Sequence, residues 1–197
     1  MMEFCRISPA LAVWFTYDPT VKADLFSTAF AARNELTVVD PIALPAPHRT
    51  ELDSLGRVAT IVVTNANHLR DTLNFARNDS PSIFAPSELN AELTHHHALS
   101  DGLQVGPFRA IKIDGAAEGE FALYHPDDGG TLIVGDALIN FEPHGFDLLP
   151  QKYCTNHKRM IRSLRRLLDF DFNRLFFAHG NPIVTRARER LASLLPS

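Results

Sequence analysis

The chain has 197 residues, of which 45% are hydrophobic and 21% are charged, with a formal net charge of -4 and an isoelectric point near 6.1. This length can bury one core, so we expect a single domain over residues 1–197. The weak negative charge creates no field that attracts nucleic acid or an anionic membrane to the whole molecule, and binding to either would need a local patch. We therefore expect a small-molecule substrate or ligand and no nucleic-acid or membrane partner.

Two features bear on the cellular location. Cys5 and Cys154 lie far apart in the sequence, and two cysteines in a chain of this size do not make a disulfide framework. The N-terminal residues lack the basic region and apolar stretch of a secretory signal, and no window approaches the roughly 18 apolar residues of a membrane span. The prediction is a cytoplasmic protein with reduced thiols, and homodimerisation is left open.

The first third of the chain is predicted to form strands. Leu11–Tyr17 is apolar and aromatic, and Leu25–Ala32 is a second apolar run. A third run, Leu36–Val39, ends at Asp40-Pro41, where proline stops a ladder of strand hydrogen bonds. Residues Glu51–Leu55 fit the end of a short helix.

The next segment, Val58–Val63, is rich in β-branched residues and almost wholly apolar, which is typical of a strand buried on both faces. We interpret it as a central strand. After it, Leu69, Leu73 and Ala76 share one helical stripe, and Ser82–Ala85 begins a further short strand. Polar residues follow the carboxyl end of the central strand, which is where open α/β sheets usually carry ligand sites.

From residue 103 the hydrophobic period changes to two. This period indicates strands over Val105–Ile113, Phe121–Tyr124 and Thr131–Val134. Residues 126–130, Pro-Asp-Asp-Gly-Gly, form the expected hairpin turn between the last two. Arg174–Ala178 is predicted as a later strand.

Two helices are predicted in the last quarter of the chain, and Thr155 or Asn156 can cap the first. Apolar stripes at helical spacing define them: Met160, Ile161, Leu164, Leu167 and Leu168 in the first, and Ala187, Leu191, Leu194 and Leu195 in the second. This order of elements predicts an α/β fold, a four-layer αββα sandwich of two mixed β-sheets with helices on both outer faces.

Three motifs stand in a particular order along the chain. After the central strand comes Thr64-Asn65-Ala66-Asn67-His68-Leu69-Arg70-Asp71, after a later strand comes Val134-Gly135-Asp136-Ala137-Leu138, and near the C-terminus comes Ala178-His179-Gly180. This order resembles that of the metallo-β-lactamase superfamily. That family has a Thr-His-x-His-x-Asp-His signature, a Gly-His loop, a Gly-Asp and a final His-Gly in this order. The resemblance covers nearly the whole chain, and it implies the four-layer sandwich and a metal-dependent hydrolase.

Carried over residue by residue, the resemblance implies a depleted metal site. Asn65, Asn67, Leu69 and Arg70 stand where the family has His, His, Asp and His, and the histidine of the Gly-His loop falls on Ala116. None of these side chains is a good zinc ligand, and a guanidinium repels a cation. The first metal position therefore loses its three protein ligands.

A shift of one residue restores part of the site. His68 then takes the second histidine position and Asp71 the final one, and residues three apart at a helix start can share a face. With Asp136 and His179 they supply two imidazoles and two carboxylates, enough for one divalent metal such as zinc, iron or manganese. Structural alternatives stay open: Asp71 serves the helix amides, His68 is solvated, Asp136 accepts from loop amides or pairs with His179 or Arg70, and His179 donates to a carbonyl.

Two functional hypotheses follow. The first is a hydrolase with a reduced, at most mononuclear site, in which Asp136 and His68 act in catalysis and the metal lowers the pKa of a water that attacks an ester, thioester or amide. The second is a non-catalytic member without metal, which binds a small molecule or a protein partner in the same cleft. The predicted substrate-binding residues are Asn65, Asn67, Arg70 and His144.

Surface interpretations account for the other conspicuous residues. Consecutive side chains of His95-His96-His97 cannot all face one site, so we expect a surface loop there, and we place His125 and His144 at the rim. A basic face on the first C-terminal helix would, in some members of the resembled superfamily, fit a nucleic-acid substrate, but the acidic overall charge favours a solvated face with Asp169 and Asp171 nearby. That face comprises Lys158, Arg159, Arg162, Arg165 and Arg166.

Overall fold

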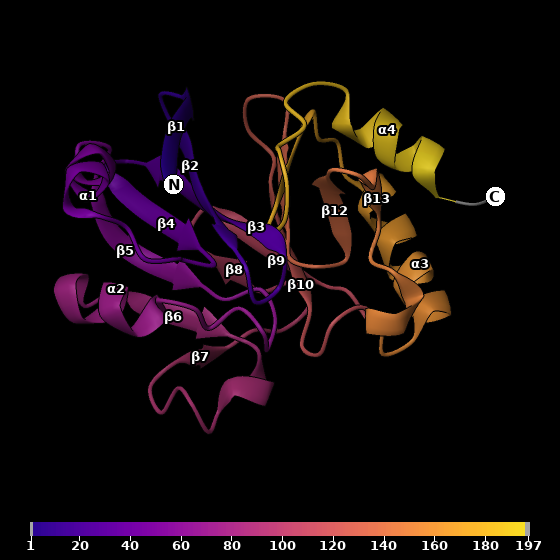
Figure 1. The fold of residues 1–197 in the computed structure, drawn as a ribbon, viewed down its shortest axis with the longest axis horizontal. Helices are drawn as coiled ribbons and strands as arrows, with labels where there is room; N and C mark the ends of the chain where they lie inside the picture. The colour runs from indigo at the N-terminus through magenta and orange to yellow at the C-terminus, as the bar shows by residue number, and fades with distance from the viewer. Residues whose placement is uncertain (1, 196–197) are drawn as a thin grey trace.

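The computed structural model describes residues 2–195 and shows four layers (Figure 1). Helices α1 (Ala46–Asp53) and α2 (Thr72–Asp79) cover the outer face of a seven-stranded sheet, and α3 (His157–Arg166) and α4 (Ala187–Leu194) cover that of a five-stranded sheet. The predicted sandwich of two mixed sheets with helices on both outer faces is confirmed. No helix within residues 2–195 is both long and apolar enough to cross a membrane.

The first sheet follows chain order, because each strand pairs with the next one. The first four strands are antiparallel and joined by turns, whereas β4 to β7 are parallel and need crossovers, two of which contain α1 and α2. The strands are β1 (Glu3–Ser8), β2 (Leu11–Asp18), β3 (Ala23–Ala32), β4 (Glu35–Val39), β5 (Arg57–Val62), β6 (Ser82–Ala85) and β7 (His97–Ala98).

The second sheet has the order β14-β11-β10-β9-β8, in which only β11 and β14 are parallel. A separate hairpin of β12 (Leu138–Phe141) and β13 (Gly145–Leu148) lies beside it. The five strands are β8 (Gln104–Val105), β9 (Phe108–Lys112), β10 (Phe121–His125), β11 (Thr131–Val134) and β14 (Arg174–Phe177). Short 3-10 turns are η1 (Ser87–Leu89), η2 (Gln151–Tyr153) and η3 (Leu167–Asp169).

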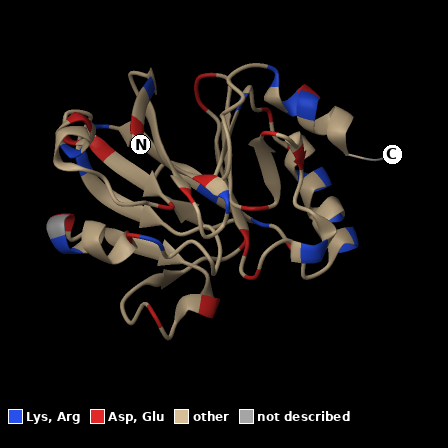
Figure 2. Cartoon of the chain, viewed as in Figure 1, with Lys and Arg blue, Asp and Glu red and all other residues tan. Residues whose placement is uncertain are grey.

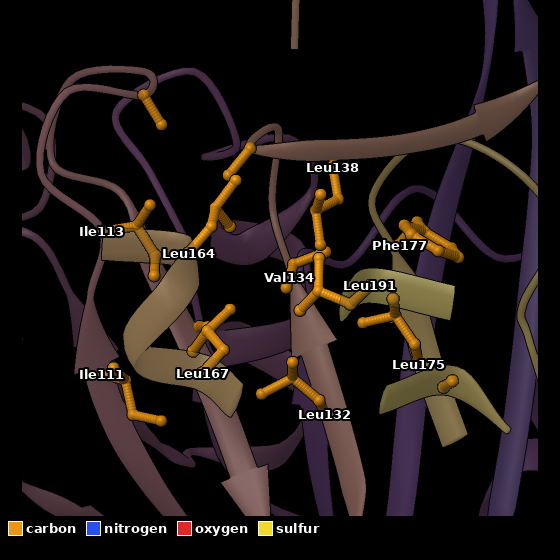
Figure 3. Close-up of a cluster of buried hydrophobic side chains, with 14 of the residues drawn as sticks. Ile111, Ile113, Leu132, Val134, Leu138, Leu164, Leu167, Leu175, Phe177 and Leu191 are labelled. Carbon is orange, nitrogen blue, oxygen red and sulfur yellow. The ribbon is translucent and has the colours of Figure 1, made fainter. Parts of the chain in front are cut away.

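Apolar clusters fill the spaces between the layers. One lies between the two sheets, and another packs Trp14 beneath α1 and α2, where its indole Nε1 donates to the Ile42 carbonyl at 3.1 Å. A third packs Leu164 of α3 and Leu191 of α4 onto the second sheet (Figure 3). Burial of these side chains is the main force that holds the helices on the sheets.

Some sequence-based boundaries were wrong. The predicted strand Val105–Ile113 is two strands, because Gly106 has φ +53° and turns the chain between β8 and β9. Helix α2 begins at Thr72, so Leu69 precedes it and Leu73 is 45% exposed, while Phe75 faces the core. The strands β1, β7, β12 and β13 were not predicted from the sequence.

The carboxyl ends of four strands meet at one end of the sandwich. Asp40 follows β4, Thr64 lies two residues after β5, Asp136 follows β11, and His179 follows β14. Backbone hydrogen bonds join the two sheets at this point: one runs from the Phe26 amide to the Ala178 carbonyl (2.9 Å) and another from the Phe121 amide to the Thr64 carbonyl (2.8 Å). The polar side chains after these strands therefore stand on a tightly connected frame.

Candidate metal centre

Two imidazoles and one carboxylate converge where the sheets join. Asp136 Oδ1 lies 3.1 Å from His68 Nε2 and 3.3 Å from His179 Nε2, and one ligand atom from each of the three residues lies within 4.8 Å of the others. His68 is only 3% exposed, and Asp136 and His179 are 14% and 16% exposed. The cluster is therefore open to solvent on the side of Asp136 and His179.

Both imidazoles are oriented through the nitrogen that faces away from Asp136. His68 Nδ1 lies 2.9 Å from Asp40 Oδ2, and His179 Nδ1 lies 3.1 Å from the Asp24 carbonyl oxygen. Metal-binding histidines are commonly held in this way, by a carboxylate or a backbone carbonyl on the second ring nitrogen. The arrangement turns both Nε2 atoms toward the same carboxylate.

Asp40 is itself fixed by the segment that follows β5. Its Oδ1 accepts the Thr64 amide at 2.7 Å, and its Oδ2 accepts the Thr64 hydroxyl at 2.6 Å. Burial alone would raise the pKa of Asp40, but the charge of His68 and these hydrogen bonds outweigh burial and hold its pKa below the usual value. Asp40 is therefore a buried carboxylate, and it holds His68 in place.

The charges in the cluster reinforce one another. Burial alone would lower the pKa of His68, but the carboxylates of Asp136 and Asp40 raise it to about 9 against the opposing charge of Arg70. Burial alone would raise the pKa of Asp136. The charge of His68 and the hydrogen bonds from His179 and His68 outweigh burial and hold the pKa of Asp136 well below its ordinary value. In the absence of a bound cation, His68 is thus an imidazolium between two carboxylates.

A second polar pair closes the other side of Asp136. The Asn65 amide donates to Asp136 Oδ2 at 3.1 Å and to Glu120 Oε2 at 2.7 Å, and Glu120 Oε1 accepts the Ala137 amide at 3.1 Å. Burial and the nearby charge of Asp136 raise the pKa of Glu120 to about 8. Asn65 and Glu120 are both fully buried, so they support the cluster from behind and do not face solvent.

Arg70 stabilises the backbone beside the cluster. Its guanidinium donates to the carbonyls of Phe26 (2.6 Å), Asp40 (3.1 Å) and Ala178 (3.4 Å), and so spans the first sheet and the end of β14. Burial lowers the pKa of Arg70, and the charges of Asp40 and Asp136 partly offset this effect. Arg70 therefore places a positive charge of the chain itself beside the cluster.

Of the four residues predicted as metal ligands, the structure brings together His68, Asp136 and His179. Asp71 lies outside this group: it occupies the position before α2, and its Oδ1 accepts the Asn74 side-chain amide at 2.5 Å. The shared helix face assumed for His68 and Asp71 does not form, because the helix starts only at Thr72. His68 is buried, so the solvated alternative was wrong.

The other predicted residues lie in varied surroundings. Asn67 and His144 are exposed, and the His144 ring lies 5.6 Å from that of Phe141 on the β12–β13 hairpin. In the triple-histidine segment His95 and His97 are exposed, but His97 begins β7, so the expected surface loop ends at His96. His125 was wrongly placed at the rim: it is 9% exposed, and its ring packs against Phe30.

Sequence reasoning missed Asp40 and Glu120 as parts of the site. Asp40 was interpreted as the end of a strand and the start of the family match, and Glu120 was not singled out. Each had a local signal in the sequence: Asp40 directly follows an apolar strand, and Glu120 directly precedes the apolar strand β10. An acidic residue next to a buried strand needs a polar partner, and that need is the signal that could have found them.

Gly135 leaves just enough room for this network. A Cβ atom there would lie 2.6 Å from Thr64 Oγ1, 2.8 Å from Glu120 Oε1 and 3.0 Å from Asn65 Nδ2. We expect Gly135→Ala to lower the free energy of unfolding by about 1–3 kcal/mol, because several hydrogen-bonded atoms must move. Urea denaturation measures the loss, and a loss below about 0.5 kcal/mol would show that the network is loosely packed.

Comparison with known proteins agrees with this geometry. A family model described as the metallo-beta-lactamase superfamily matches residues 4–197. The chain therefore belongs to the metallo-beta-lactamase superfamily. A comparison with curated protein sequences gives no match.

Several solved structures share the fold. A metallo-beta-lactamase from Erythrobacter litoralis has 15% identity and a TM-score of 0.72, with 98% of this chain and 92% of that chain covered. One from Pontibacter korlensis has 13% identity and a TM-score of 0.74, with 99% of each chain covered. A metallo-beta-lactamase family protein from Thermus thermophilus has 22% identity and a TM-score of 0.68, with 96% and 79% covered. At these identities the likeness shows the fold alone.

Proposed function

We propose that the protein is a metal-dependent hydrolase with a single metal site, held by His68, Asp136 and His179, that acts on an ester, thioester or amide bond of a small molecule. The observation that carries this proposal is the convergence of both Nε2 atoms on Asp136 Oδ1 while both Nδ1 atoms are held from behind. Membership of the metallo-beta-lactamase superfamily supports the reaction class.

The donor set fits a divalent metal. Nitrogen and oxygen ligands about 2.0–2.2 Å from a tetrahedral zinc ion lie roughly 3.3 Å from one another. The distances of 3.1 and 3.3 Å from Asp136 Oδ1 to the two imidazole nitrogens are close to that spacing. Three protein ligands, with solvent access beside Asp136 and His179, are the arrangement of catalytic zinc sites. Zinc, iron and manganese all accept imidazole and carboxylate ligands.

When bound, a divalent ion supplies Lewis acidity, which polarises a carbonyl and makes water nucleophilic at neutral pH. The chain's own residues orient the site. Asp40 and the Asp24 carbonyl fix the two imidazole rings, and His68 gives up a proton when its Nε2 becomes a ligand, because only the neutral ring nitrogen can bind. Asn67 and His144 are exposed and remain the proposed substrate contacts, whereas the side-chain amide of Asn65 is already engaged by Asp136 and Glu120.

The same contacts support a site for at most one metal. The residues at the family's other ligand positions, Asn65, Asn67, Leu69, Arg70 and Ala116, include no imidazole or carboxylate. Asn65 donates to Asp136 Oδ2 and so engages the carboxylate oxygen that a second ion would need. Cys5 and Cys154 are both free, which supports the proposed cytoplasmic location.

Metal analysis of protein purified without chelator tests the proposal. We expect about one equivalent of zinc, iron or manganese, lost in the double variant Asp136→Ala, His179→Ala and retained in the matched controls Asp71→Ala and His144→Ala. Two equivalents in the unaltered protein would rule out the single-metal site. Retention of the metal by the double variant would rule out the assigned ligands.

A second candidate is a non-catalytic binding protein. It is favoured by the completeness of the polar network, since His68, Asp136 and His179 satisfy one another through direct contacts. Its signature is no metal in the purified protein and no rise in melting temperature when zinc, iron or manganese is added, because binding to the folded state would raise it.

A further inference from the structure

Charge is segregated along the chain. Residues 151–197 contain ten Lys and Arg and three Asp and Glu, whereas residues 1–150 contain nine and twenty. The formal charge of the C-terminal segment is therefore +7, and that of the remainder is -11. Figure 2 shows basic residues gathered on α3 and α4, at one side of the molecule. The weak net charge of -4 hides this local concentration, and a basic segment of this kind points to a polyanionic partner.

Five of these cations form one exposed face on α3, which we call the basic stripe: Lys158, Arg159, Arg162, Arg165 and Arg166. At 100° per residue they span about 120° of the helix. The opposite side buries Met160, Ser163 and Leu164. The helix contains no Asp or Glu, so its cations have no acidic neighbours on the same helix.

The basic stripe lowers the stability of its own helix. Lys158 and Arg162, and Arg162 and Arg166, are like-charge pairs four residues apart, which disfavour a helix. Lys158 and Arg159 also lie in the first turn, where the helix dipole is positive. Asn156, which caps the helix by accepting the Arg159 amide at 3.0 Å, and the buried apolar face hold α3 in place despite these charges. Stability therefore gives no reason for Lys158, Arg159 and Arg162, whereas Arg165 and Arg166 lie in the last turn, where the helix dipole favours cations.

Most of the stripe is also unused inside the fold. Within residues 2–195, the side chains of Lys158, Arg159 and Arg162 have no partner, and Arg166 pairs with Asp101 at 2.8 Å across a half-exposed contact. The arginines of α4 differ: Arg188, for example, donates to the Leu168 carbonyl at 2.6 Å. Lys158, Arg159 and Arg162 are thus available to a ligand.

We propose that the basic stripe binds the phosphodiester backbone of a single-stranded nucleic acid without sequence preference. Arginine forms paired hydrogen bonds with phosphate oxygens, and four of the five cations are arginine. Tyr153, which is 60% exposed, ends η2 four residues before α3, and Lys152 Nζ lies 4.7 Å from its ring centroid. An exposed aromatic ring beside a cation is what single strands use for base stacking. This surface lies on the outer helix layer and is additional to the proposed metal site.

The structure disfavours the two other anionic partners. An amphipathic helix binds an anionic membrane by inserting its apolar face, but Met160 and Leu164 of α3 are buried in the core. A second copy of this chain would have to present an acidic face to the stripe, and residues 1–150 carry nine cations among their twenty carboxylates, so their charge is mixed. The alternative interpretation of the sequence, a solvated face, rests on the net charge of the whole chain and on Asp169 and Asp171 nearby.

Fluorescence anisotropy with a labelled oligouridylate RNA and the full chain tests the proposal. With four phosphate contacts we expect binding to weaken about 50-fold between 50 and 200 mM KCl, from a slope near -0.7 per contact in log-log form. Removing two contacts in Arg159→Gln, Arg162→Gln should halve that slope, and Tyr153→Ala should weaken binding about fivefold or more.

The matched control is Arg6→Gln, Arg57→Gln, which removes the same charge from exposed positions of β1 and β5 and should leave the slope unchanged. No binding at 50 mM KCl, or an equal loss of slope in both double variants, overturns the proposal. So does binding of the full chain to phosphatidylserine vesicles but not to RNA. Salt-sensitive self-association that requires the stripe, without RNA binding, would assign the surface to a second copy instead.

Discussion

Replacing Asp40 with alanine is expected to lower the free energy of unfolding by about 3–5 kcal/mol, because it removes one partner of a buried ion pair. Asp40 is 2% exposed and accepts hydrogen bonds from the amide and hydroxyl of Thr64 while facing His68 at 2.9 Å. The variant leaves the Thr64 amide without its acceptor and the imidazolium with one carboxylate in place of two. Urea denaturation in the presence of a chelator measures the loss.

The variant Asp40→Asn removes the negative charge at residue 40 and keeps a side chain of nearly the same shape. It retains an acceptor for the Thr64 amide, so we expect a smaller loss of stability, but it removes the carboxylate that orients His68. Metal affinity, measured by competition with a chromogenic chelator, should fall about 10- to 100-fold, as for other carboxylates behind a histidine ligand. The surface control Glu92→Ala should leave both quantities nearly unchanged. An Asp40→Ala variant that loses less than about 1 kcal/mol would show that the pair is not a structural anchor.

The layered fold could be predicted because it depends on local patterns. Val58–Val63 is almost wholly apolar, and most of β5 is buried. The alternating runs of the second half became the strands of the second sheet. The sequence-based error at Val105–Ile113 came from reading through Gly106, whose left-handed backbone makes a turn that hydrophobicity does not reveal. The order of the strands within each sheet was not predicted.

The site was harder to predict because its contacts are distant in sequence. Asp136 and His179 were found from motif order, but Asn65 meets Glu120 across 55 residues and His68 meets Asp40 across 28. Asp71 lies outside the cluster for a local reason, because α2 starts at Thr72 and the Asp71 side chain pairs with Asn74. A polar residue's partner is decided by how strand ends assemble, and no spacing rule contains that information.

The polar residues around the cluster follow one physical rule. Buried polar groups need partners, and Arg70 and Asn65 supply donors at the strand ends. Arg70 donates to three backbone carbonyls, and Asn65 links Glu120 to Asp136. These contacts join segments of both sheets at the cluster.

The stability of the metal-free protein is expected to fall as pH rises from about 6.5 to 9. His68 has a pKa near 9 in the folded state against 6.5 for the free side chain, so the folded state keeps a proton that the unfolded state releases over this range. Its contribution, about 3 kcal/mol, is fully present below pH 6.5 and lost above pH 9. Glu120, with a pKa near 8 against 4.5, acts in the same direction from lower pH.

Urea denaturation across this pH range, in the presence of a chelator, measures the free energy of unfolding at each pH. Two variants then assign each part of the fall to one residue. Glu120→Gln should remove the fall between about pH 4.5 and 6.5 and reduce it up to about pH 8, while His68→Gln should remove the fall between about pH 8 and 9 and reduce it from about pH 6.5. Asp40 and Asp136 have lowered pKa values, so the stability they contribute is lost only in acid, as the pH falls below about 4. A flat profile between pH 6.5 and 9 in the unaltered protein would mean that His68 is neutral when folded, and its role between the two carboxylates would then have to be abandoned.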